Sequence, residues 1–163
     1  MTKGERISQF VAELEGTAPV SGRDDVAQHP CYRGFFRCWN EQRYYEAHDV
    51  LEHLWLKTNS AESDYFKGLI QAAGAFVHLQ KHFEHPTHRV HGRRLAPAAR
   101  LIRLAEKNLT PFGPTRHGFD VAGLLQLLLK NERAIVDSAF TKNPWSPVTA
   151  PQLSLSGAES LTN

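Results

Sequence analysis

Apolar residues recur along the chain at the three- and four-residue spacing that places them on one face of a helix. This pattern predicts helices over residues 4–15, 30–40, 43–57, 60–83, 87–108 and 120–139. No segment alternates between apolar and polar residues with a period of two, and no hairpin turn signal is present. The sequence therefore predicts an all-α fold, a bundle of five or six helices in a single domain.

Cap and turn residues set the ends of these helices. Pro30 suits the first turn of its helix, and Asp120 suits the N-cap of the last one. Asn59 or Ser60 is expected to cap the longest helix. Because Pro97 lies inside the stretch predicted to be helical from residue 87, a kink or break is expected there.

The predicted helical domain spans residues 1–140, and residues 141–163 are expected to form an irregular or mobile C-terminal tail. Phe35 and Trp145 are candidates for an exposed apolar patch at which two copies of the chain associate. A homo-oligomer is therefore one expected partner state.

Composition narrows the class of protein. Of the 163 residues 41% are hydrophobic, which is enough for a core, and the formal net charge is only +2. So small a charge favours neither a nucleic-acid-binding protein nor an acidic tail.

The N-terminal residues lack the apolar region of a signal peptide, and no apolar run is long enough to cross a bilayer, so a cytoplasmic protein is predicted. Cys31 and Cys38 lie about 10.5 Å apart along one predicted helix, which is too far for a disulfide, so free thiols are expected.

The most informative stretch is YYEAHDVLEHLW, residues 44–55, in which ionisable side chains are interspersed with core-type residues. His48 and Glu52 are four residues apart and share one face, beside the apolar stripe of the helix. A carboxylate and an imidazole at such a border suit metal ligation, acid–base chemistry or a polar contact between helices.

Gln71 and His78 supply a second polar pair on the next helix. They are seven residues apart and therefore nearly stacked on its surface. The helical wheel allows two placements: across a seam of small residues that faces His48 and Glu52, or at the rim of the solvated face. The spacing alone leaves both placements open.

If the two pairs converge, His48, Glu52 and His78 form a divalent-metal site with an open position, as in catalytic zinc or non-haem iron centres. Zinc, iron or manganese bound there would lower the pKa of water to about 7. Glu46 and Glu52 are the candidate catalytic carboxylates, and Asp49 is an alternative proton acceptor.

Two other interpretations need no metal. The same residues suit metal-free acid–base catalysis, or a buried hydrogen-bonded network that only holds helices together. In such a network Glu52 accepts a hydrogen bond from His48 or from the Trp55 indole, and Tyr45 and Gln71 complete it. Tyr45, Trp55 and Gln71 are equally the candidate residues for contacting a cofactor.

A second group of histidines follows at the end of the same helix: His78, His82 and His85 on one face, with His88 and His91 beyond. The group contains no carboxylate and is expected to face water, so it is a poor physiological metal site. Arg93, Arg94 and Arg100 nearby suit phosphate contacts, but no aromatic platform accompanies them, and a solvated helix face is the favoured interpretation.

The stretch at residues 44–55, with FKGLIQAA at 66–73 and HLQ at 78–80, resembles domain-of-unknown-function family 309 (DUF309), small all-α proteins labelled predicted metal-dependent hydrolases. The resemblance covers residues 30–105. It implies that two groups of residues face each other, which favours the seam placement: Tyr45, Glu46, His48, Glu52 and Trp55 on one helix, and Gly68, Gln71 and His78 on the next. The chain departs from the family pattern at Asp49, where Glu is more usual, and in its extra histidines at 82, 85, 88 and 91.

Two functions from different classes follow. One is a metal-dependent hydrolase acting on a small molecule. The other is a non-enzymatic small-molecule-binding or interaction module whose polar cluster is structural. Neither membrane binding nor nucleic-acid binding is expected.

Overall fold

The computed structural model describes residues 25–58 and 60–156, together with residues 5 and 9. The helix predicted over residues 4–15 lies outside this part of the chain, apart from those two positions. The described part contains five α-helices and a single two-stranded sheet, which confirms the all-α prediction. The helices are α2 (Pro30–Asn40), α3 (Tyr44–Leu56), α4 (Ser63–Glu84), α5 (Leu95–Leu109) and α6 (Val121–Asp137). None of the helices in the described residues combines the length and apolar character needed to cross a membrane.

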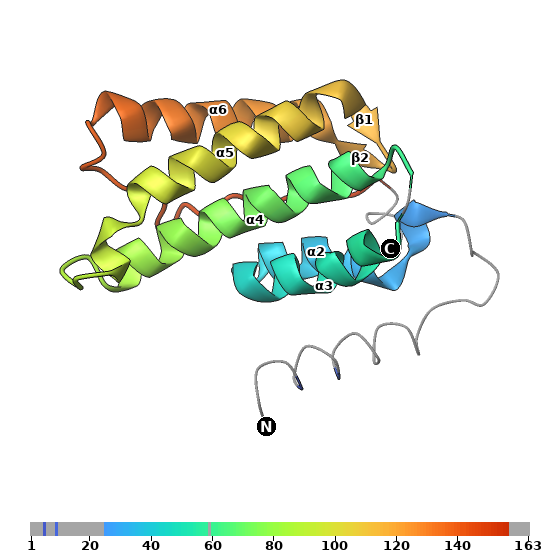
Figure 1. Cartoon of the computed structure of the whole chain (residues 1–163), viewed down its shortest axis with the longest axis horizontal. Helices are drawn as coiled ribbons and strands as arrows, with labels where there is room; N and C mark the ends of the chain where they lie inside the picture. The colour runs from blue at the N-terminus through green and yellow to red at the C-terminus, as the bar shows by residue number, and fades with distance from the viewer. Residues whose placement is uncertain (1–4, 6–8, 10–24, 59, 157–163) are drawn as a thin grey trace.

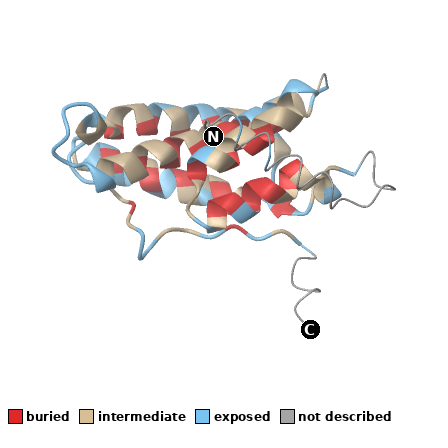
Figure 2. Ribbon diagram, turned by 90° about the horizontal axis from the view of Figure 1, so that it is seen from below, coloured by how far each residue is buried: buried red, intermediate tan, exposed pale blue. Residues whose placement is uncertain are grey.

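The helices pack in the order in which they follow one another along the chain. Helix α4 lies in the middle, with α5 and then α6 on one side and α3 and α2 on the other (Figure 1). The buried residues of each helix face this shared interior (Figure 2). At its centre the Trp39 ring lies 4.6 Å from Phe76 and 5.1 Å from Tyr44 between ring centroids. Phe35, which the sequence offered as an exposed association patch, is fully buried here, so that prediction is wrong.

Several predicted helix ends are confirmed. Pro30 is the first residue of α2, and the N-cap His29 accepts the Cys31 N–H at 3.1 Å. Asp120 caps α6 by accepting the Gly123 N–H at 2.9 Å. Cys31 and Cys38 are buried free thiols, as expected.

The beginnings of α4 and α5 were predicted too early. Helix α4 begins at Ser63, and the Ser60 hydroxyl instead accepts the Glu62 N–H at 3.2 Å. Helix α5 begins at Leu95 rather than near residue 87, after a loop with a 3₁₀ turn at His91–Arg93. Pro97 therefore falls in the first turn of α5, where its missing N–H would have no helical partner, and the predicted kink does not occur.

A small hairpin was not predicted. Strands β1 (Thr115–Arg116) and β2 (Phe119–Asp120) pair antiparallel between the 3₁₀ turn Thr110–Phe112 and α6. The two residues between them, His117 and Gly118, both have positive φ, +48° and +75°. Turns of this geometry are usually formed by Asn-Gly or Asp-Gly. Because histidine occupies the first position here, the sequence did not predict the turn.

Beyond α6 the chain runs without helix along the bundle (Figure 2), and its residues contact α4, α3 and α2. Asn143 Nδ2 donates to the Leu79 carbonyl at 2.8 Å, and Trp145 Nε1 donates to the Tyr44 hydroxyl at 3.0 Å. Trp145 is only 4% exposed, so it belongs to the core and does not form the surface patch that the sequence suggested.

Candidate functional site

Three side chains with metal-binding atoms meet on α3: His48, Asp49 and Glu52. Nδ1 of His48 lies 2.9 Å from Oδ1 of Asp49 and 3.8 Å from Oε2 of Glu52. One ligand atom from each residue lies within 4.8 Å of the other two, and no other such group of three is present in the described residues. We refer to these three residues as the α3 cluster.

The apolar residues of α3 fix the position of this cluster. The helix is anchored in the core by fully buried side chains at one face: Tyr44, Ala47, Val50 and Leu51. The α3 cluster lies at the border of that face, and its three side chains are half-buried. The exposed ring of Tyr45 stacks on the His48 ring with centroids 6.4 Å apart and a 27° angle between planes. Tyr45 therefore covers one side of the imidazole.

His48 meets α4 at a glycine. A Cβ atom at Gly74 would lie 4.0 Å from Cδ2 of His48 and 3.2 Å from Cδ1 of Leu101 on α5. The imidazole therefore lies against bare backbone of α4, at a point shared with α5. Gln71 and His78 are one helical turn before and after Gly74, so their Cβ atoms lie about 5–6 Å from this point. His48 thus lies near the stretch of α4 that carries Gln71 and His78, whose own hydrogen bonds go to Asn108 and Arg94.

Gln71 and His78 each have a hydrogen-bond partner on α5 or at its N-cap. Asn108 Nδ2 donates to Oε1 of Gln71 at 2.7 Å, and Arg94 Nη1 lies 3.0 Å from Nδ1 of His78. His78 does not belong to the α3 cluster, although the sequence placed it in the same metal site. An arginine N–H can only donate, so Nδ1 of His78 accepts and the neutral ring carries its proton on Nε2. Burial, with Arg94 and Arg100 nearby, lowers the pKa of His78 and keeps the ring neutral at pH 7.

Two further predicted site residues have other contacts. Trp55 Nε1 donates to the Ser63 hydroxyl at 3.1 Å, which ties the end of α3 to the start of α4. Burial raises the pKa of Cys38, and the Glu46 carboxylate is one of the nearby charges that act in the same direction. Its charge is thus felt near the end of α2.

The sequence did not identify four residues that shape the site. Gly74, Leu101, Arg94 and Asn108 were not singled out as seam residues, although Arg94 was noted for its charge. A signal for Gly74 was present, because it is three residues after Gln71 and four before His78. The α5 residues carried no such signal, since their approach to α4 depends on where α5 begins.

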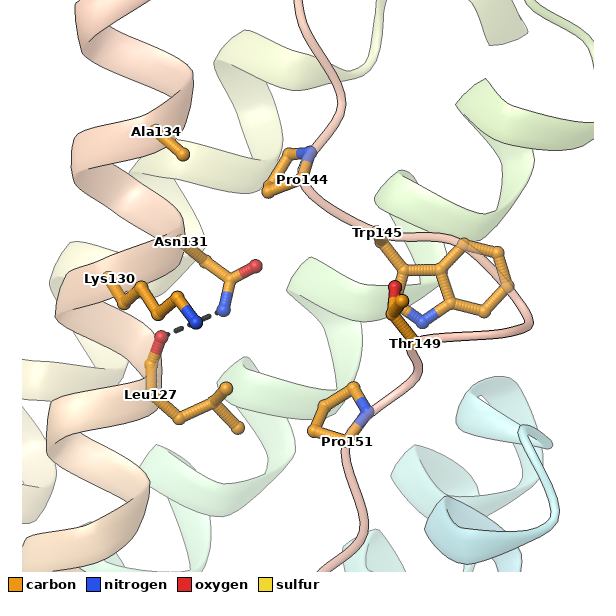
Figure 3. A pocket seen from close by; sticks show the side chains of 8 residues that line it. All are labelled: Leu127, Lys130, Asn131, Ala134, Pro144, Trp145, Thr149 and Pro151. Carbon is orange, nitrogen blue, oxygen red and sulfur yellow. Dashed lines mark hydrogen bonds between the residues drawn. The ribbon is translucent and has the colours of Figure 1, made fainter.

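A separate pocket of about 200 Å³ lies between α6 and the C-terminal segment (Figure 3). Asn131 extends into it from α6, is 8% exposed, and donates from Nδ2 to the Leu127 carbonyl at 2.8 Å. Pro144, Trp145 and Pro151 form the opposite wall. This pocket shares no residue with the seam.

Comparison with known proteins finds a family match for part of the chain and no activity. Residues 32–90 match the model of a family described as Domain of unknown function (DUF309), which confirms the resemblance seen in the sequence. The match contains α3, α4 and all three residues of the α3 cluster. Neither the comparison with curated proteins nor the one with solved structures finds a match.

Proposed function

We propose that this DUF309 protein is a metal-dependent hydrolase whose divalent cation is held by His48, Asp49 and Glu52. The observation that carries the proposal is the convergence of one imidazole nitrogen and two carboxylate oxygens on one helix turn. In the described part of the chain both carboxylates have His48 as their ion-pair partner. Because two carboxylates lie beside a single imidazole, the group keeps negative charge that a cation would balance.

The donor atoms suit such a cation. Ligands that lie 2.0–2.1 Å from a zinc ion are separated from each other by roughly 3 Å. Nδ1 of His48 and Oδ1 of Asp49 are 2.9 Å apart, which already fits. Oε2 of Glu52 is 3.8 Å from Nδ1, and its 40% exposed side chain is free to close that gap by rotation. An imidazole with two carboxylates suits zinc, manganese or iron.

In this proposal His48 and Gln71 bind the substrate beside the cation. With Nδ1 turned to the cation, His48 carries its proton on Nε2, next to the Cδ2 atom that faces Gly74. This N–H then donates to a substrate oxygen at the seam. Gln71, whose Oε1 is occupied by Asn108, offers its amide N–H groups beside it. When bound, the cation supplies Lewis acidity, which favours attack of water on an ester or amide.

Metal analysis of untagged protein tests the proposal. We expect about one zinc or manganese per chain, and loss of that metal in His48→Ala. His53→Ala is the matched control, because it removes a histidine from the same helix outside the cluster. Metal content that is unchanged in His48→Ala, or equally reduced in His53→Ala, would contradict the proposal. Hydrolysis of p-nitrophenyl phosphate and p-nitrophenyl acetate, with and without the metal, then reports the activity.

The second candidate is a non-enzymatic binding or interaction module. It is favoured by the 2.9 Å contact between His48 and Asp49, which is a complete hydrogen bond without a metal. In that case Asp49→Asn lowers the stability of the protein, whereas the purified chain contains no stoichiometric metal. Those two results together would select the module over the hydrolase.

A further inference from the structure

Positive charge is concentrated where α4 passes into α5. Residues 78–100 contain one lysine and four arginines but a single acidic residue, Glu84, so the segment has a formal charge of +4 while the whole chain has +2. Five of the nine histidines lie in the same segment. The segment therefore has a single carboxylate of its own to neutralise it.

Arg94 is the centre of this region. Its Nη1 lies 3.0 Å from Nδ1 of His78, while Nε and Nη2 lie 3.0 and 2.6 Å from Nδ1 of His91. The half-buried guanidinium thus has two imidazoles as partners, and no carboxylate pairs with it in the described part of the chain. A guanidinium has five N–H donors. Three are used here, which leaves one on each terminal nitrogen.

The hydrogen bonds also fix which nitrogen of each imidazole carries the proton. Nδ1 of His88 accepts the backbone N–H groups of Val90 and His91 at 3.0 and 3.1 Å. Nδ1 of His78 and Nδ1 of His91 accept from Arg94, as described above. In all three neutral rings the proton is therefore on Nε2, which acts as a donor.

This arrangement disfavours a metal and favours an anion. A metal ligand needs a free nitrogen lone pair, and the lone pairs of His78, His88 and His91 are already used. Together with Arg94 the three rings instead present five N–H donors. Burial is the main cause that lowers the pKa values of His78 and His91, and the charges that add to it are all cationic, among them Arg94, Arg100 and Lys81. An anion is the species that such a field attracts.

The loop that carries these donors is tightly built. A Cβ atom at Gly92 would lie 2.4 Å from the Pro86 carbonyl oxygen, so the backbone at the two ends of the loop is in close contact at this glycine. The ring centroids of His88 and His91 are 4.6 Å apart, and that of His85 is 5.6 Å from His91. The donors are therefore grouped before any ligand binds.

From these observations we infer that Arg94, His78, His88 and His91 form a binding site for a phosphate group, carried by a small-molecule phosphate monoester. A phosphate dianion has three terminal oxygens and accepts the five donors more completely than a carboxylate with two. His78 is one helical turn from Gly74, where His48 contacts α4. A phosphate held at Arg94 therefore lies along the same seam as the α3 cluster. The identification of this phosphate ester as the substrate rests on the proposed hydrolase, whereas the site itself does not.

Calorimetric titration of inorganic phosphate into metal-free protein tests the site. We expect saturable binding of one phosphate per chain and at least a tenfold loss of affinity in Arg94→Gln. Arg133→Gln is the matched control, because it removes the same charge from an exposed position on α6 and should leave the affinity within twofold. Equal losses in both variants would reveal non-specific attraction and overturn the inference. Tighter binding of a single-stranded oligonucleotide than of phosphate would overturn the small-molecule ligand.

A second measurement needs no variant and covers the case that Arg94→Gln does not fold. In ¹⁵N NMR spectra of the histidine rings, we expect Nε2–H tautomers for His78, His88 and His91, with Nε2–H signals that shift on addition of phosphate. Nδ1–H tautomers, or signals that move with zinc but not with phosphate, would contradict the site. Because metal-free protein is used throughout, phosphate binding without metal binding would retain this site and reject only the hydrolase.

Discussion

The His48 ring lies against Gly74, so α3 and α4 approach each other at a residue that has no side chain. A larger residue at Gly74 must displace either the imidazole or Leu101. We expect Gly74→Leu to weaken zinc binding at least tenfold in a calorimetric titration, because the displaced ring no longer faces Asp49 and Glu52. An affinity equal to that of the parent protein would show that the seam does not position His48.

Gly68→Ala is the control for this substitution. It lies on the same helix, but its added Cβ would be 2.6 Å from Cγ of Leu109, away from His48. Overpacking costs about 1–3 kcal/mol, which the better helix propensity of alanine offsets by up to about 1 kcal/mol. This variant should therefore be less stable in urea while its zinc affinity is unchanged.

The C-terminal segment is held to α2 by a reciprocal pair of hydrogen bonds. Asn40 Nδ2 donates to the Leu153 carbonyl and Asn40 Oδ1 accepts the Leu153 N–H, both at 2.7 Å. We expect Asn40→Ala to lower the free energy of unfolding by about 1–3 kcal/mol, because both backbone groups of Leu153 lose their partner. Urea denaturation measures this change. Asn40→Asp, which keeps the acceptor but not the donor, should fall between the parent and the alanine variant.

Local sequence rules were sufficient where one residue determines one feature. Pro30 and Asp120 mark helix starts through their own backbone and side-chain chemistry, and both predictions are confirmed. The predicted beginning of α5 was wrong because residues 87–94 have a composition compatible with a helix. In the structure these residues form a tight loop instead, in which Gly92 lies close to Pro86.

In the candidate site, too, features set by nearby residues were predicted and contacts between distant residues were not. The spacing of His48 and Glu52 placed both on one face of a helix, and the structure brings them together within 3.8 Å. The partner of His78 could not be read from the sequence, because Arg94 reaches it only after the chain has turned back through a ten-residue loop. Trp145 was likewise assigned to a tail without structure, since its contact with Tyr44 spans 101 positions of the chain.

Both cysteine thiols should be unreactive in the folded protein. Burial raises the pKa of Cys38 to about 11, so almost none of it is thiolate at pH 8, and Cys31 is only 1% exposed. We expect no reaction with Ellman's reagent within minutes at pH 8, and two thiols per chain after addition of urea. Rapid labelling of the native protein would show that α2 opens readily from the bundle.

The contact between α5 and α6 should weaken as pH rises through neutrality. Oε1 of Glu106 is buried without a hydrogen-bond partner, and Arg103 is bound to the neighbouring Glu132 at 2.8 Å. Burial, and then the neighbouring Glu132, raise the pKa of Glu106 to about 7. A carboxyl whose pKa is higher in the folded than in the unfolded state stabilises the fold when protonated. This contribution is complete below the ordinary pKa of glutamate and is lost as pH rises through about 7.

Glu106→Gln isolates this effect, because glutamine keeps a donor for Glu132 and does not ionise. The parent should lose stability between pH 5 and pH 8, whereas the variant should vary less over that range and be the more stable of the two at pH 8. Thermal melts at the two pH values measure the difference, with exposed Glu84→Gln as the control that should follow the parent. Parallel pH profiles of the parent and Glu106→Gln would mean that Glu106 is already ionised in the folded protein at pH 5, and that its carboxylate is hydrated despite its position between the two helices.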